Sequence, residues 1–231
     1  MIRCDFILIA LCAVWACAPG AVRGADQAEI ETLLKRDIIG GDLSMAEVQW
    51  YCDERVPAIP PVTTVEQWEQ EAERIRAAVL ERIVYRGAAA GWRDAETKVE
   101  WLDTIDGGPG YRIRKLRYEA LPGLWIPALL YEPEQLTGQV PVILNVNGHT
   151  PLGKQYPPKQ IRCINQAKRG MLALNIEWVG MGQLAGPGFN HGHMNQLDLC
   201  GTSGLAPFYL NLKRGLDVLL SLEHADPRRV A

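Results

Sequence analysis

The sequence predicts an α/β protein in which antiparallel edge strands lead into parallel strand–helix–strand (βαβ) units. Alternation of apolar and polar residues, typical of strands with one solvated face, occurs at residues 99–105, 111–120 and 124–131. Two later segments, 140–146 and 171–176, are almost wholly apolar, as are strands covered on both faces of a parallel sheet. Residues 159–169 between them favour a helix, which completes a right-handed crossover unit.

The composition indicates a folded globular protein. Of the 231 residues, 48% are hydrophobic and 22% are charged, which is ordinary for a globular chain. The formal net charge of −3 provides neither a basic surface for nucleic acid nor a polyacidic tail. We therefore expect a buried core and no nucleic-acid partner, and the composition gives no indication of the oligomeric state.

Residues 1–24 have the pattern of a secretory signal peptide. Met1-Ile2-Arg3 carries positive charge, and the apolar run at 6–18 is shorter than the roughly 20 residues that span a bilayer. Small or apolar residues precede a cleavage point after Gly24. We expect an exported protein, periplasmic or extracellular, with no membrane contact beyond this signal; an uncleaved anchor or a misplaced start codon are the alternatives.

Residues 25–97 are predicted to form a helical N-terminal extension. A helix-prone stretch at 25–51 is followed by a proline-rich linker, 56–61, that no helix can cross. Thr63 or Thr64 is then positioned to cap a helix over 65–85. Its apolar face is expected to consist of Trp68, Ala72, Ile75, Val79 and Ile83. Residues 98–231 form the α/β part.

Three cysteines follow the predicted cleavage site, namely Cys52, Cys163 and Cys200. An odd number leaves at least one thiol without a partner within the chain. Pairing of Cys163 with Cys200 stays open, as does the simpler interpretation that the cysteines are buried and reduced. Their wide spacing does not match a zinc site, and we expect no bound metal.

The loop after the apolar strand at 140–146 is the clearest candidate for chemistry. Ligands of open α/β sheets bind outside the carboxyl ends of strands, which is where Asn147, Gly148, His149 and Thr150 fall. Backbone N–H groups there can stabilise a developing negative oxygen, and Gly148 permits a tight turn and a close approach of substrate. An ordinary strand-end turn with a hydrogen-bonded histidine is the alternative.

Several other patterns are interpreted as structural. Gly201-Thr202-Ser203-Gly204 is one residue short of G-x-S-x-G, so Ser203 is expected to cap a helix over 206–224. His191 and His193 could be combined with His149 and Asp198 into a metal site. The two histidines are expected on a loop that does not fix a metal geometry, so we do not expect one. His224 is expected at the helix C-terminus, and Glu177 as a loop carboxylate. Gly180-x-Gly182 lacks the third glycine of a dinucleotide fingerprint, so we expect no nicotinamide cofactor.

Longer stretches resemble a known family. They are residues 145–149, 159–170, 175–183, 194–204, 213–217 and 226–231. Together they are similar to the bacterial, acetyl-xylan-esterase-like branch of the α/β-hydrolase superfamily, and the resemblance covers roughly Trp101 to Ala231. It implies the N-terminal portion of an α/β-hydrolase fold, truncated before the nucleophile elbow, with residues 98–231 as the first part of the domain.

The resemblance also implies a function. The expected activity is that of an exported serine ester hydrolase, a carboxylic-ester hydrolase acting on a carbohydrate ester such as acetylated xylan or on a small-molecule ester, with no cofactor. In this superfamily the serine, the acid and the histidine follow the strand opened by Asp226-Pro227, so none is assigned here and the chain as given is expected to be inactive. Gly148, His149 and Thr150 become candidates for the oxyanion side. A peptidase, another carboxylesterase or a non-catalytic secreted binding module are the alternatives.

The same reasoning predicts a solubility problem. If the chain stops before its next strands, the strand at 171–176 is expected to be a long apolar edge of the sheet. Exposed apolar edges favour aggregation. Poor solubility of the isolated chain is therefore expected.

Overall fold

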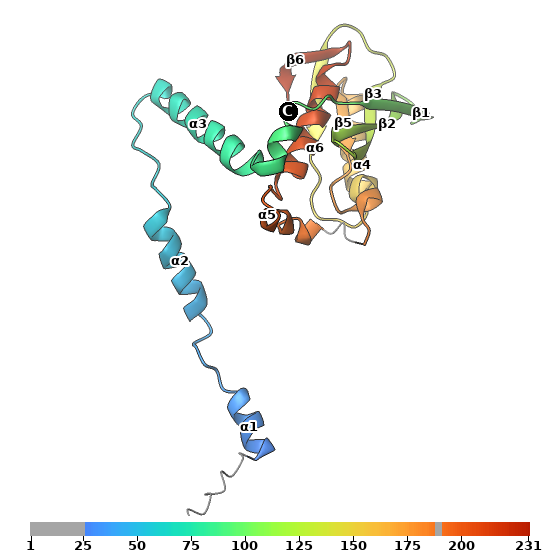
Figure 1. Ribbon diagram of the computed structural model, residues 1–231. Helices are drawn as coiled ribbons and strands as arrows, with labels where there is room; N and C mark the ends of the chain where they lie inside the picture. Colours follow the sequence, from blue (N-terminus) through green and yellow to red (C-terminus); the bar gives the residue numbers. More distant parts are fainter. Residues whose placement is uncertain (1–25, 188–190) are drawn as a thin grey trace, which may run out of the picture. The chain divides into compact units, whose positions relative to one another are not determined.

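The computed structural model describes residues 26–187 and 191–231 (Figure 1). The predicted signal peptide, residues 1–24, lies outside the described residues. The chain divides into two compact units, Met1–Pro61 and Val62–Ala231. Among the helices of the described residues, none combines the length and the apolar character needed to cross a membrane.

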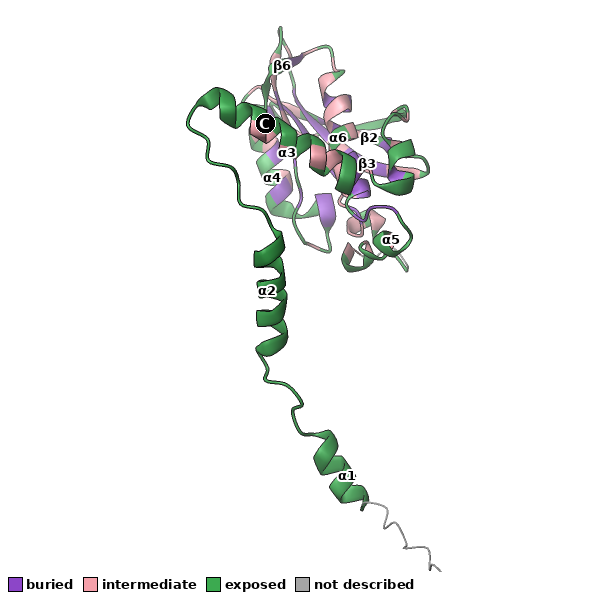
Figure 2. Ribbon diagram, turned by 60° about the vertical axis from the view of Figure 1, so that its left-hand side comes forward, coloured by how far each residue is buried: buried purple, intermediate pink, exposed green. Residues whose placement is uncertain are grey.

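The described part of the first unit consists of two helices, α1 (Gln27–Leu34) and α2 (Leu43–Arg55). Every described residue of this unit is exposed, including the large side chains of Ile38 and Trp50 (Figure 2). The helix-prone stretch predicted at 25–51 is thus two helices, the second ending four residues later than expected. Helices this short are marginally stable on their own. Their apolar side chains are not covered by other described residues of this unit.

The second unit begins with α3 (Val65–Val79), which continues into a π-helical turn, η1 (Leu80–Val84), and a 3-10 turn, η2 (Gly87–Trp92). The predicted cap is confirmed at Thr64, whose hydroxyl accepts the Gln67 N–H at 3.2 Å. This contact satisfies one of the backbone donors left open at the start of a helix.

The apolar face predicted for this helix is only partly covered. Ala72 and Ile75 are half-buried, whereas Trp68, Val79 and Ile83 are exposed. Burial begins only at Val84 in the π-helical turn, where the chain reaches the body of the unit. The 3.6-residue periodicity therefore identified the helix but not the extent of its burial.

Six strands form one mixed sheet. They are β1 (Val99–Asp106), β2 (Tyr111–Leu121), β3 (Leu124–Pro133), β4 (Val140–Asn145), β5 (Leu172–Ile176) and β6 (Ala225–Val230). Their order in the sheet is β1-β2-β3-β5-β4-β6. The first three strands and β5 pair antiparallel in turn, while β4 pairs parallel with both β5 and β6. The predicted division into antiparallel and parallel strands is confirmed.

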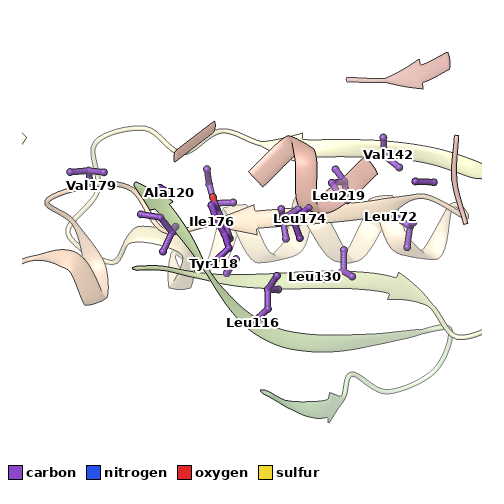
Figure 3. Packing of buried hydrophobic residues seen from close by; sticks show 14 residues of the cluster. Leu116, Tyr118, Ala120, Leu130, Val142, Leu172, Leu174, Ile176, Val179 and Leu219 are labelled. Atoms are coloured by element: carbon purple, nitrogen blue, oxygen red, sulfur yellow. The ribbon is translucent and has the colours of Figure 1, made fainter. Parts of the chain in front are cut away.

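Two long helices cover opposite faces of the sheet. Packing against α6 (Ala206–Leu220) forms the larger core, where Figure 3 shows Tyr118, Leu174 and Leu219 gathered in one layer. A smaller cluster lies under α4 (Pro157–Lys168) and includes Cys163 and Tyr131. Each large apolar side chain buried in this way contributes roughly 1.5–3 kcal/mol.

The strand predicted to be an exposed edge is an interior strand. Every residue of β5 is buried, and it lies between β3 and β4, so the reasoning that made it an aggregation-prone edge is wrong. The prediction placed β5 at the end of the sheet because it follows β4 along the chain. The crossover through α4 instead places β5 between β4 and β3. The two edges of the observed sheet are β1 and β6.

The helix expected to reach His224 ends earlier, at Leu220. The Ser221 hydroxyl donates to the Val218 carbonyl at 2.7 Å as the chain turns. His224 lies in the following turn, where its Nδ1 is 2.9 Å from the Gly138 carbonyl oxygen and its own carbonyl accepts the Val140 N–H. His224 therefore joins β6 to β4 and does not stabilise a helix terminus.

Candidate active site

The loop that follows β4 is anchored at both sides of Gly148. Asn147 is buried, and its side-chain amide donates to Asn175 Oδ1 at 3.0 Å and to the Ile176 carbonyl, both on β5. On the other side, the Lys159 ammonium donates to the Gly148 carbonyl at 3.2 Å. Because a trans peptide points its C=O and N–H in opposite directions, this contact also fixes the direction of the His149 N–H.

The predicted oxyanion-side residues carry unused donors. Within the described part of the chain, the backbone N–H groups of residues 148–150 donate no hydrogen bond to another backbone group or side chain. Gly148 and His149 are exposed and Thr150 is half-buried. Donors held in place and left without a protein acceptor are what an anionic ligand atom requires.

Gly148 itself is not required by the turn. Its φ angle lies outside the left-handed region, and a Cβ added there would meet no atom within 4 Å. The prediction that this glycine supplies a special dihedral angle is therefore wrong. The left-handed conformation occurs further along the same loop, at Gly153 (φ +54°), where the Gly153 N–H donates to the Thr150 carbonyl.

A cavity of about 520 Å³ opens beside this loop. Its lining residues come from the loops after β4 and β5, and they are His149, Thr150, Pro151, Gly180, Met181, Ala185, Gly186, His191 and Gly192. Two of the three predicted residues, His149 and Thr150, are thus brought to one cavity at the carboxyl ends of two parallel strands. Gly148 adjoins it without lining it.

A buried ion pair supports the loops after β4 and β5, and it was not predicted from the sequence. Glu177, directly after β5, is 0% exposed and accepts the Lys154 ammonium at 2.8 Å. The same carboxylate accepts the backbone N–H groups of Lys154 at 2.9 Å and Gln183 at 3.1 Å. Glu177 is thus a carboxylate of the loop after β5, as predicted, but the prediction did not include the complete enclosure of its side chain.

Polar contacts continue from this pair into the core. The Asn211 amide on α6 donates to the Glu177 carbonyl at 2.9 Å, and the Tyr118 hydroxyl donates to Asn211 Oδ1 at 2.7 Å. The Asn175 amide donates to the Lys154 carbonyl at 3.0 Å. The ends of β4 and β5 are thus joined to each other and to α6, which gives the candidate site a rigid support.

Two histidines meet across the cavity. Nε2 of His149 lies 2.8 Å from Nε2 of His191, and the two rings are nearly perpendicular with centroids 4.5 Å apart. His191 also contacts the rings of Phe208 (5.0 Å) and Trp178 (6.3 Å). From the sequence, His149 was interpreted as an oxyanion-side residue or as a hydrogen-bonded histidine of a turn, and His191 only as a possible metal ligand. The contact between the two was not predicted, because 42 residues separate them.

The remaining predicted sites have structural surroundings. Ser203 is buried, and its hydroxyl accepts the Leu205 N–H at 3.2 Å; the formal cap of α6 is Leu205, so the predicted cap is two residues out of place. Asp198 pairs with Arg86 at 2.8 Å. Among the described residues, no group of three or more His, Cys, Asp or Glu side chains could hold a metal ion.

The three cysteines of the described residues are free thiols. Cys52 and Cys200 are exposed, whereas Cys163 is buried under the sheet. Burial raises the pKa of the Cys163 thiol to about 12. The pairing of Cys163 with Cys200 that the sequence left open is therefore not formed.

Solved structures identify the fold. No family model and no curated protein matches the sequence. A Bacteroides fragilis protein assigned as an acetyl xylan esterase superposes with a TM-score of 0.64 at 15% identity, over 90% of this chain and 55% of that one. A methylesterase superposes with a TM-score of 0.57 at 19% identity, over 82% of this chain and 39% of that one. The chain has an α/β-hydrolase fold.

This fold confirms the resemblance to acetyl-xylan-esterase-like α/β-hydrolases that the sequence indicated. At such low identities the likeness concerns the backbone arrangement, and it does not transfer an activity. The chain spans about half of the first solved structure and about two fifths of the second. In an α/β-hydrolase fold, the cavity beside residues 148–150 lies at the end of the sheet where ligands are bound.

Proposed function

We propose that the protein is an exported serine ester hydrolase of the α/β-hydrolase type that acts on an acylated carbohydrate such as acetylated xylan. The observation that carries this proposal is the set of N–H groups at residues 148–150 that have no acceptor among the described residues and are held beside a cavity of about 520 Å³. In α/β-hydrolases a loop between a strand and a helix supplies one oxyanion donor, and the loop between β4 and α4 has that place here.

The proposal divides the chain into three parts. Residues 1–24 are a signal peptide, residues 25–97 a helical extension and residues 98–231 the first part of the hydrolase domain. The catalytic serine, acid and histidine belong after β6 and outside these 231 residues. The 231-residue chain by itself is therefore expected to be inactive, although it holds the oxyanion side of the site.

The reaction would follow the usual course of acyl transfer. The serine attacks the ester carbonyl, the resulting oxyanion accepts N–H groups, the alcohol leaves and water hydrolyses the acyl-enzyme. Residues 148–150 would supply one donor, and the residue after the serine would supply the other. Loss of one such donor typically costs about 3 to 4 kcal/mol of transition-state stabilisation.

Enzyme assays on a protein that continues beyond residue 231 test the proposal. We expect hydrolysis of p-nitrophenyl acetate and release of acetate from acetylated xylan, together with covalent labelling by a fluorophosphonate. The 231-residue chain, assayed in parallel, is expected to show neither. Turnover of aminoacyl substrates alone would indicate a peptidase, and turnover of simple esters alone another carboxylesterase. Absence of both labelling and turnover would indicate a binding module.

A further inference from the structure

The histidine pair ties together the two loops that enclose the cavity. His149 belongs to the loop after β4, and His191 begins the 3-10 turn η5 (His191–His193) in the long loop after β5. Their Nε2 atoms are 2.8 Å apart, which is a hydrogen-bond distance. Two neutral imidazoles can make this contact only if one donates its proton and the other accepts with a lone pair.

The surroundings of His191 decide which ring donates. Nδ1 of His191 is buried and has no hydrogen-bond partner within the described part of the chain. A buried N–H without an acceptor is less favourable than a bare ring lone pair. The proton of His191 therefore belongs on Nε2, from which it is donated to Nε2 of His149. His149 then carries its own proton on Nδ1.

A second proton would break this contact. If His149 is protonated at Nε2, this N–H faces the Nε2–H of His191. The contact then survives only if His191 moves its proton to the buried Nδ1. The elements that contact His191 offer no counter-charge, since Phe208 and Trp178 are neutral and His193 is in the same turn. Lys159, which donates to the carbonyl of Gly148 next to His149, is itself cationic and therefore offers no counter-charge.

Glu177 and Asp198, two carboxylates of the chain after β5, do not compensate for that charge. Glu177 is enclosed and is already ion-paired with Lys154. Asp198, the acidic residue that follows His193 along the chain, is paired with Arg86. The pair is therefore stable with one shared proton and opens when it gains another.

We propose that His191 is a positioning residue for the oxyanion loop. By donating to His149 it holds residues 148–150 in one conformation beside the cavity, and acidification that adds a proton to the pair releases that loop. This inference rests on the proposed ester hydrolase function. It assigns to the pair a pH-dependent control of catalysis that is separate from the titration of the catalytic histidine.

Three variants of the full-length protein test this role. His191→Phe keeps an aromatic ring against Phe208 and removes the donor; His191→Gln keeps an N–H donor that does not titrate. His193→Phe is the matched control in the same turn, because its side chain is exposed and does not line the cavity. Circular dichroism melting shows which variants fold, and nitrogen-detected NMR of the histidine rings reports the tautomer and the titration of His149.

We expect the NMR spectrum to show His149 protonated at Nδ1 in the wild type and in His191→Gln, and at Nε2 in His191→Phe. The kcat of His191→Phe at pH 8 should fall about tenfold or more with little change in KM, because a small displacement of catalytic groups has effects of this size. His191→Gln should keep most of the activity and lose part of the decline on the acid side, while His193→Phe should follow the wild type.

Two results would overturn the proposal. One is a His149 ring whose tautomer and titration are the same in His191→Phe as in the wild type. The other is a folded His191→Phe variant with the expected NMR change and an unaltered kcat. If the NMR change occurs but the wild type hydrolyses no ester, the contact is supported and the proposed hydrolase function is what fails.

Discussion

The buried ion pair between Lys154 and Glu177 is predicted to be a major source of stability at the end of the sheet where the cavity lies. Glu177→Gln should lower the free energy of unfolding by about 3 to 5 kcal/mol, the usual effect of removing one partner of a buried pair. Glu177 is 0% exposed and Lys154 is 4% exposed, so water cannot replace the lost partner.

The geometry explains why an amide of the same shape is a poor substitute. Three donors converge on the carboxylate: the Lys154 N–H at 2.9 Å, the Lys154 ammonium at 2.8 Å and the Gln183 N–H at 3.1 Å. A glutamine has one oxygen, and in either orientation its NH2 group faces at least one of these donors. The ammonium also loses the negative charge that offsets its burial.

Guanidinium denaturation followed by tryptophan fluorescence measures the effect. Asp103→Asn is a matched control, because the Lys115–Asp103 pair has the same 2.8 Å separation but lies at the surface, and its stability should be nearly unchanged. Adding Lys154→Met to Glu177→Gln should restore part of the loss, since the unpaired Lys154 ammonium is then no longer buried. The reasoning is refuted if Glu177→Gln unfolds at the same denaturant concentration as Asp103→Asn.

Two further predictions concern the same unit. Gly153→Ala should lower the free energy of unfolding by about 1 to 3 kcal/mol, because Gly153 has φ +54° and an added Cβ would overlap the Glu177 carboxylate; equal denaturation midpoints would contradict this. The Arg228 backbone N–H, then the Arg229 guanidinium, lower the pKa of Asp226, so its stabilising effect is present at neutral pH and is lost as the pH falls below about 4. Asp226→Asn should therefore melt below the wild type at pH 7 and converge with it in acid, whereas parallel melting curves would disprove the linkage.

The elements of this fold were largely predictable from local patterns. Strand periodicity depends on neighbouring residues, so β1, β2 and β3 were located within two residues of their observed ends. The apolar run of β5 predicted its burial, but the position of this strand between β3 and β4 was not predicted, because strand order depends on where the crossover through α4 returns the chain. No local pattern carries that information.

The candidate site was predictable only in part, for a similar reason. The loop at 148–150 follows an apolar strand, and position relative to a strand end is a local signal. The partners that shape this loop are distant: His191 is 42 residues from His149, and Glu177 is 23 residues from Lys154. One available signal was Glu177 itself, a carboxylate directly after a wholly apolar strand, where burial demands a partner of opposite charge.

The described contacts explain how one short loop can be both fixed and unsatisfied. Asn147 binds it to β5, Lys159 orients the peptide after Gly148, and His191 holds the His149 ring, so three separate elements restrain three consecutive residues. Lys159 is largely buried, and this burial, followed by the nearby Arg162 guanidinium, lowers the pKa of its ammonium. Ordinary turns satisfy their own N–H groups and need no such restraints. A loop that is held from outside while its donors stay open has its donors organised before a ligand arrives, and this is the condition under which backbone N–H groups stabilise an oxyanion strongly.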